Sequence, residues 1–170
     1  MIRPILIHPD PRLKKVVPPV ADVSDALRTL ADDMLATMYD APGIGLAAPQ
    51  IGVMSRIFVM DCADPEATPE PLVMLNPEII GASDELGVYE EGCLSIPDIY
   101  ADVTRPEAVT IRWLDLNGDI QQRDFDGLHA TCAQHELDHL DGKLFIDYLS
   151  TMKRSMITNK MKKLKKARAS

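Results

Sequence analysis

Cysteine is scarce in this chain of 170 residues, which holds only Cys62, Cys93 and Cys132. An odd number of cysteines without a C-x-x-C pair argues against a disulfide framework and favours a reducing cytosol. Long apolar runs are missing as well, since no stretch approaches the roughly 18 residues of a membrane span. The first eight residues have the pattern of neither a secretory signal nor a transit peptide. We therefore expect a cytoplasmic protein without a membrane segment.

Basic residues are outnumbered, with 18 Lys and Arg against 26 Asp and Glu and a net charge of −8. This balance argues against sequence-specific nucleic-acid recognition. The hydrophobic fraction of 46% and charged fraction of 26% are typical of a globular protein and exclude disorder, collagen and coiled coil. The length suits a single domain over residues 1–170. The charge is uneven, because residues 151–170 carry eight basic and no acidic residues, whereas residues 1–150 have a net charge of −16.

Apolar residues at helical spacing predict helices over residues 24–40, 128–140 and 150–167. Ser24 is the expected N-cap of the first helix, and Asp141-Gly142 should end the second. In the last, basic helix, we expect Leu149, Met152, Met156, Ile157 and Met161 to face the body of the protein, while the lysines face water.

The middle of the chain favours strands, with Asn117-Gly118 marking a tight hairpin. The expected strands cover residues 56–60, 72–75, 78–80, 86–89, 108–114 and 119–125. Helices at both ends with strands between them predict an α+β fold. Its mainly antiparallel strands would pack around the central helix of residues 128–140, followed by the C-terminal helix.

The sharpest local motif is His135-Glu136-Leu137-Asp138-His139, which reads H-E-x-x-H within a predicted helix. Residues four apart share one helix face, so both imidazoles can reach one metal ion. A metal there lowers the pKa of a bound water towards about 7, and Glu136 can take its proton. The alternative is a polar helix face with two solvated histidines.

A third ligand must come from upstream of this motif. No glutamate follows Glu136, no histidine follows His139, and the extended H-E-x-x-H motif would need histidine where Phe145 stands. Cys132 would span nearly two turns with His139, about 10 Å of rise, and is better interpreted as pocket wall. Cys93 lies in a turn suited to ligation, although a buried structural thiol fits equally well. The upstream candidates are His8, Cys62, Cys93, His129 and Cys132.

Three blocks in register make the sequence resemble the peptide deformylase family. They are GIGLAAPQ at 43–50, EGCLS at 91–95 and QHELDH at 134–139, and HPDPRL at 8–13 and GKLF at 142–145 extend the similarity. The resemblance implies a metallohydrolase that removes the N-formyl group from the formylmethionine of newly synthesised proteins and releases formate. Its substrates would be N-formylmethionyl nascent peptides.

The resemblance also implies residue roles. The metal would be Fe2+, replaceable by Ni2+, Co2+ or Zn2+, with Cys93, His135 and His139 as its ligands. Glu136 would be the general base, while the Gln50 side-chain amide and the Leu94 backbone N–H would stabilise the oxyanion. The substrate backbone and methionine side chain would lie against Gly43, Ile44, Gly45, Tyr89, Leu128, Thr131, Cys132 and His135.

Some features leave alternatives open. Tyr100 stands where many members carry arginine, and Thr131 where an aliphatic residue is usual, so the preference for later peptide residues is not determined. Asp138 is either a solvated acid or an orienting residue paired with Arg105. The chain could also be a related peptidase for unformylated peptides, or a binding module. The basic helix would dock on the ribosome, or only keep the protein soluble.

Overall fold

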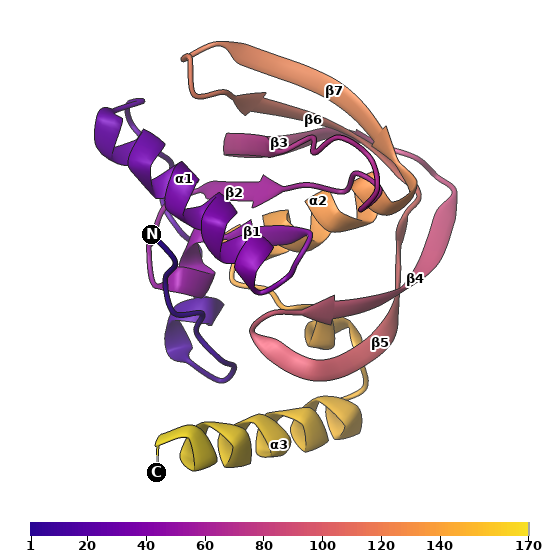
Figure 1. Ribbon diagram of the computed structural model, residues 1–170. Coiled ribbons are helices and arrows are strands. Elements are labelled where there is room, and N and C mark those ends of the chain that lie inside the picture. The colour runs from indigo at the N-terminus through magenta and orange to yellow at the C-terminus, as the bar shows by residue number, and fades with distance from the viewer. Residues whose placement is uncertain (170) are drawn as a thin grey trace.

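The computed structural model describes residues 1–169 and has three α-helices and seven strands in this part of the chain (Figure 1). The helices are α1 (Asp25–Asp40), α2 (Gly127–Leu140) and α3 (Thr151–Ala169). The strands are β1 (Gly45–Ala47), β2 (Ile57–Met60), β3 (Leu72–Ala82), β4 (Leu86–Cys93), β5 (Ile96–Pro106), β6 (Ala108–Leu114) and β7 (Ile120–Asp126). Short 3-10 helices are η1 (Pro11–Lys14), η2 (Ala48–Ile51) and η3 (Phe145–Tyr148). The predicted α+β class is confirmed.

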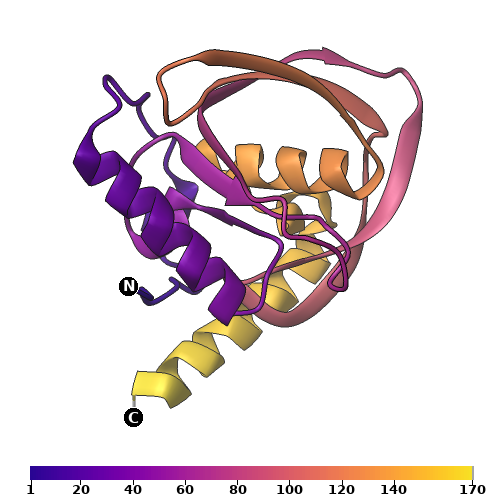
Figure 2. The same cartoon turned by 45° about the horizontal axis from the view of Figure 1, so that its top comes forward.

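The strands form a five-stranded antiparallel sheet in the order β1-β2-β3-β6-β7 and a separate β4–β5 ribbon. Figures 1 and 2 both show α2 between the sheet and the ribbon, so the strands surround this helix as predicted. Ala130 and Ala133 are fully buried against Phe58 and Met74 of the sheet. Small side chains on this face let α2 pack closely on the strands. The helix that carries the H-E-x-x-H motif is thus held in the centre of the fold.

The predicted helices are confirmed to within a few residues. The Ser24 hydroxyl accepts a hydrogen bond from the Leu27 backbone N–H at 3.2 Å, as expected of an N-cap. The expected strands at 72–75 and 78–80 are one irregular strand, β3, in which the register shifts beyond Leu75 and Asn76 has a φ of 49°. The hairpin is confirmed, but Leu114 pairs with Ile120, so its loop is longer than a two-residue turn. The Asp115 carboxylate accepts backbone N–H groups within that loop and stabilises it.

Two strands escaped the sequence analysis. The β5 strand has prolines at positions 97 and 106, which favour loops, although its residues alternate between buried and exposed from Ile99 onwards. The β1 strand is only three residues long, and Gly45 at its start obscured it. Both strands carry or border residues that line the cavity. Because the sequence did not predict these strands, it could not show how the site is assembled.

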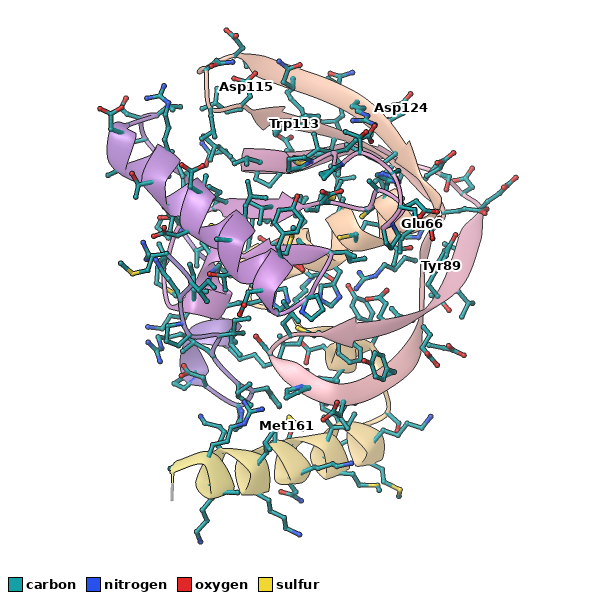
Figure 3. All side chains as sticks on the ribbon, viewed as in Figure 1. Glu66, Tyr89, Trp113, Asp115, Asp124 and Met161 are labelled. Carbon is teal, nitrogen blue, oxygen red and sulfur yellow. The ribbon has the colours of Figure 1, made fainter. Side chains whose placement is uncertain are left out.

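The C-terminal helix packs on the body through part of the seam expected from the sequence. Met161 is 2% exposed and faces the rest of the molecule (Figure 3), and Ile157 and Leu164 pack beside it. Met152 and Met156 are 75% and 66% exposed, so the prediction that they face the body was wrong. The buried row runs through 157, 161 and 164, at helical spacing, so the prediction is confirmed for Ile157 and Met161. No helix within residues 1–169 is long and apolar enough to cross a membrane.

Gly142 combines a positive φ with a close contact to the N-terminal segment, so a larger residue there should destabilise the fold. Its φ is +74°, and a Cβ atom there would lie 2.5 Å from the Lys14 backbone oxygen, where the N-terminal segment crosses the end of α2. Gly142→Ala should therefore lower the free energy of unfolding by at least about 2 kcal/mol. Gly118→Ala is the matched control, since φ is +84° but nothing lies within 4 Å. It should cost only about 1 kcal/mol, and equal losses in urea denaturation would contradict the contact.

Candidate metal centre and substrate cavity

One sulfur and two imidazoles converge beside α2. The ligand atoms of Cys93, His135 and His139 all lie within 4.8 Å of one another, the one such group of three that residues 1–169 contain. Cys93 ends β4, whereas the two histidines lie one turn apart on α2, and the Cys93 Sγ is 3.4 Å from the His139 Nε2. Among the upstream candidates, the structure therefore brings Cys93 to the histidine pair.

This donor set fits a divalent cation of the first transition row. Thiolate and imidazole are its usual protein ligands, and metal binding needs imidazole in its neutral form. Burial holds the pKa of His139 well below its usual range and so keeps this ring neutral. On His135, burial opposes the charge, but hydrogen bonds to Cys93 and Glu91 outweigh it and raise the pKa. A proton thus competes with a cation at His135.

A chain of charged groups behind His135 fixes its orientation. The Glu91 Oε1 lies 3.0 Å from the His135 Nδ1, which leaves Nε2 directed at the centre. Arg105 donates two hydrogen bonds to Glu91, at 2.7 and 2.9 Å, and a third to the Asp138 Oδ2 at 2.8 Å. The Tyr148 hydroxyl donates to the same Asp138 oxygen at 2.7 Å. The pairing of Asp138 with Arg105 is confirmed, and such outer hydrogen bonds orient metal ligands.

Glu91 is charged although it is buried. Burial raises its pKa, but the hydrogen bonds from His135 and Arg105 outweigh burial, and the net shift is downward. The ion pair also raises the pKa of Arg105, against the effect of burial. Both side chains are at most 6% exposed. Charges this deep are stable only when paired and hydrogen-bonded, so each requires the other.

Glu136 is the buried acid closest to the centre. It is 3% exposed, its Oε1 lies 3.7 Å from the His135 Nε2, and its Oε2 has no hydrogen-bond partner among the described residues. Burial raises the pKa of Glu136 to about 7, and a cation beside it would lower that value. A carboxyl in this position can accept and release a proton near neutral pH.

Gln50 is held in one orientation on η2. Its Oε1 accepts the Ala47 backbone N–H at 2.9 Å, so its Nε2 is directed at the centre. There Nε2 donates to the Ser95 hydroxyl at 3.0 Å and approaches the Cys93 Sγ at 3.5 Å. Leu94 follows Cys93, and a Cβ atom at Gly43 would meet its side chain at 2.8 Å. The three sequence blocks therefore meet at one place.

A cavity of about 870 Å³ opens beside this centre. Ile44 and Leu128 are 44% and 46% exposed and stand at its mouth. Its lining includes most of the predicted substrate residues, namely Gly43, Ile44, Gly45, Leu128, Thr131, Cys132 and His135.

Tyr89 is the exception among the predicted substrate residues, because it does not belong to the described lining of the cavity. It shares the inward face of β4 with Glu91 but lies one pair of residues further from the centre. Its hydroxyl lies near Gly127, at the start of α2 (Figure 3). The structure therefore places Tyr89 beside the N-terminus of α2 rather than in the cavity.

Three residues of the site were missed from the sequence. Glu91 and Ser95 flank Cys93, and the two-residue period of a strand could have placed Glu91 on the same face as Cys93. Tyr148 lies in η3 and carried no signal, since its contact with Asp138 depends on how the chain returns after α2.

The fold and the centre define a class of protein. A helix with two histidines and a buried glutamate, a cysteine from a neighbouring strand, and an adjoining cavity are the parts of a metallohydrolase with one metal ion.

Comparison with known proteins gives the family. Residues 2–155 match the family described as polypeptide deformylase. Peptide deformylases of Mesorhizobium japonicum and Rhodopseudomonas palustris are 56% and 54% identical, over 99% and 97% of this chain and 96% and 95% of theirs. The crystal structure of the Legionella pneumophila deformylase has a TM-score of 0.91 at 47% identity, covering 99% of this chain and 98% of that one. The Ehrlichia chaffeensis structure has a TM-score of 0.94 at 36% identity over both whole chains.

The chain belongs to the polypeptide deformylase family, and the resemblance and enzyme class expected from its sequence are confirmed. It is a hydrolase that removes the N-formyl group from nascent peptides.

The chain of charges behind His135 generates a prediction about metal affinity. Glu91→Gln removes the charge that orients His135 and neutralises Arg105, so the affinity for a divalent cation should fall by about 10–100-fold. Glu90→Gln is the matched control, because Glu90 is the exposed neighbour on the other face of β4. Competition with a chelator at fixed pH measures both affinities. Equal affinities for the two variants would show that Glu91 has no orienting role.

Proposed function

We propose that Cys93, His135 and His139 hold one Fe2+ ion, with Ni2+, Co2+ or Zn2+ as substitutes. The convergence of these three donors supports the ligand set, and the family resemblance supports iron. When bound, the cation supplies Lewis-acid chemistry, since it polarises the formyl carbonyl and lowers the pKa of a water. Glu91, Arg105 and Asp138 keep His135 in position for it.

Glu136 is the proton carrier in this proposal. Its carboxylate accepts a proton from the attacking water as the new C–O bond to the formyl carbon forms. It then delivers that proton to the amide nitrogen as the C–N bond breaks, so one water yields formate and a free methionine amine. The observation that carries this role is the buried, unpartnered Oε2 of a carboxyl whose other oxygen lies 3.7 Å from the His135 Nε2.

The negative charge that develops on the formyl oxygen needs hydrogen-bond donors. Gln50 supplies its side-chain amide and Leu94 its backbone N–H. The fixed orientation of Gln50, set by its bond from Ala47, supports this role, because a donor already in place costs no reorganisation during the reaction.

The methionine side chain of the substrate occupies the cavity among Ile44, Leu128, Thr131, Cys132 and His135. An unbranched thioether fills such an irregular slot well. Gly43 and Gly45 bring the backbone close, and a Cβ atom at Gly45 would lie 2.9 Å from both the Cys132 Sγ and the Glu136 Cγ. The glycine therefore keeps the wall of the slot and the proton carrier in contact with the loop.

Glu136→Ala tests the proposed mechanism. With formyl-Met-Ala-Ser as substrate, the rate of formate release should fall by about 10²–10⁴-fold, the usual contribution of a general acid–base group. Metal content per chain is the control and should not change, because Glu136 is not a ligand. Full activity of this variant would eliminate Glu136 as the proton carrier. Cleavage of an internal peptide bond by the parent protein, without formate, would favour a peptidase instead.

We also propose that the whole chain works as one domain in the cytoplasm and docks on the ribosome through α3. The support is charge, since exposed lysines such as Lys153, Lys160 and Lys163 stand on a helix anchored by Met161, while residues 1–150 carry −16. Nascent chains and ribosomal RNA are found together, so a basic helix would bring the cavity to its substrate.

Neutralising charge tests this docking without disturbing the fold. Deleting α3 would expose the apolar seam around Met161, so the double variant Lys160→Gln/Lys163→Gln is preferable. Its co-sedimentation with ribosomes should weaken and become less dependent on salt, by about 0.7–0.9 in slope per lost phosphate contact. Lys15→Gln/Lys143→Gln, outside the helix, is the control, and turnover of formyl-Met-Ala-Ser should stay constant. Unchanged ribosome binding would mean that the helix only keeps the protein soluble.

A further inference from the structure

Two thiols that the proposed mechanism does not use chemically lie against each other beside the cavity. Cys62 follows β2 and is half-buried, and Cys132 is buried on α2 and lines the cavity. Each thiol has the largest single influence on the pKa of the other, so the two side chains are neighbours. Cys62 also packs against the apolar cluster that contains Cys132.

The backbone shows the same approach independently. The Ile44 carbonyl oxygen accepts the Asp61 backbone N–H at 2.8 Å and also the Cys132 thiol at 3.6 Å. Asp61 directly precedes Cys62, so the segment that carries Cys62 and the sulfur of Cys132 meet at one oxygen atom. The remaining thiol, Cys93, has its own partners in Gln50 and His139.

We propose that Cys62 and Cys132 are a site of reversible oxidation by a peroxide, and that they form a disulfide which closes down the substrate slot. Cys62 is the more exposed of the two and meets the oxidant first. The neighbouring Cys132 thiol lowers the pKa of the Cys62 thiol, whereas the Cys62 sulfur and burial raise the pKa of Cys132. The thiolate is the form that attacks, which favours Cys62 as the nucleophile.

The reaction balances with the peroxide as the only co-reactant. The Cys62 thiolate attacks one peroxide oxygen, the O–O bond breaks and hydroxide leaves, which converts Cys62 to a sulfenic acid. The Cys132 sulfur then attacks the Cys62 sulfur, and its proton leaves with the sulfenic hydroxyl as water. Two thiols lose two hydrogens and two electrons, and one hydrogen peroxide is reduced to two waters.

The position of Cys132 explains why oxidation would affect turnover, a consequence that rests on the proposed substrate slot. Its sulfur bonds the Ile44 carbonyl and lies beside Gly45, against which Glu136 also packs. A bond to Cys62 replaces the bond to Ile44 and shifts the wall on which this loop and Glu136 rest. We therefore expect the disulfide to lower kcat/KM for formyl-Met peptides.

The experiment uses the full chain loaded with Zn2+, which has no redox chemistry of its own. After treatment with hydrogen peroxide, the free thiols are alkylated and the protein is digested for mass spectrometry. The expected main product joins the peptides of Cys62 and Cys132 with the loss of two hydrogens. Formate release from formyl-Met-Ala-Ser should fall by about tenfold and recover with dithiothreitol, if the wall shift costs about 1.4 kcal/mol.

Two variants separate the pair from the metal centre. Cys62 lies outside the slot, so the Cys62→Ser variant should keep its basal activity. It should form no cross-link, and its activity should not fall after treatment with peroxide. Cys132→Ser should leave Cys62 as a sulfenic acid that dimedone traps.

Several outcomes would contradict the proposal. If Cys62 is alkylated as a free thiol after peroxide, or is oxidised without linking to Cys132, the pair is not the site. Loss of activity in Cys62→Ser to the same extent as in the parent would assign the damage to Cys93. If the cross-link forms but turnover is unchanged, the disulfide does not alter the substrate slot. If the untreated parent releases no formate, the proposed function fails, while the cross-link still tests the thiol pair.

Discussion

The buried carboxylate of Glu91 is the constraint on which the site depends. A charge at this depth is stable only when opposite charge and hydrogen bonds surround it, and Arg105 and His135 provide them. Glu91 and Arg105 belong to the β4–β5 ribbon and His135 to α2, so the same contacts that stabilise the charge join the ribbon to the helix. Cys93, two residues after Glu91 on the same strand face, is thereby brought to the histidine pair. The contacts that stabilise the buried charge of Glu91 are therefore the same contacts that assemble the metal centre.

The position of α2 is the second requirement, and it arises from packing. The helix is buried on nearly all sides, against the sheet through Ala130 and Ala133 and against the ribbon through its polar face. A helix covered in this way has no broad solvent face, so its histidines and Glu136 lie in an environment of low polarity. Burial makes Glu136 reluctant to stay charged and His139 reluctant to gain a proton. The same environment strengthens the hydrogen bonds and charges directed at the cavity.

The sequence predicted the features that depend on local interactions and missed those that depend on contacts between distant residues. Helix α1, its Ser24 cap and the helical spacing of the H-E-x-x-H motif depend on neighbouring residues, and all were predictable. The third ligand was not, because the residues alone left Cys93 among five candidates, and only the resemblance to a family selected it. Pairing of β4 with β5, which brings Glu91 and Arg105 together, joins residues fourteen apart through a strand that its prolines disguised. The buried face of α3 was predicted only in part, because several apolar residues compete for it and the packing of the body decides which of them are buried.

The two sides of the cavity differ in how they tolerate change. On the side of the ribbon, ion pairs of Glu91 and Arg105 hold the metal ligands and leave little freedom. On the side of the glycine loop, backbone hydrogen bonds hold the loop itself, but Cys132 contacts it only through van der Waals packing and one weak thiol hydrogen bond to the Ile44 carbonyl. Sulfur hydrogen bonds are weak, so Cys132 is held to the loop less firmly than the metal ligands are held to the ribbon. A chemical change at Cys132 would therefore alter the shape of the slot before it affected metal binding. The arrangement separates the residues of the metal centre from the loop on the opposite side of the cavity.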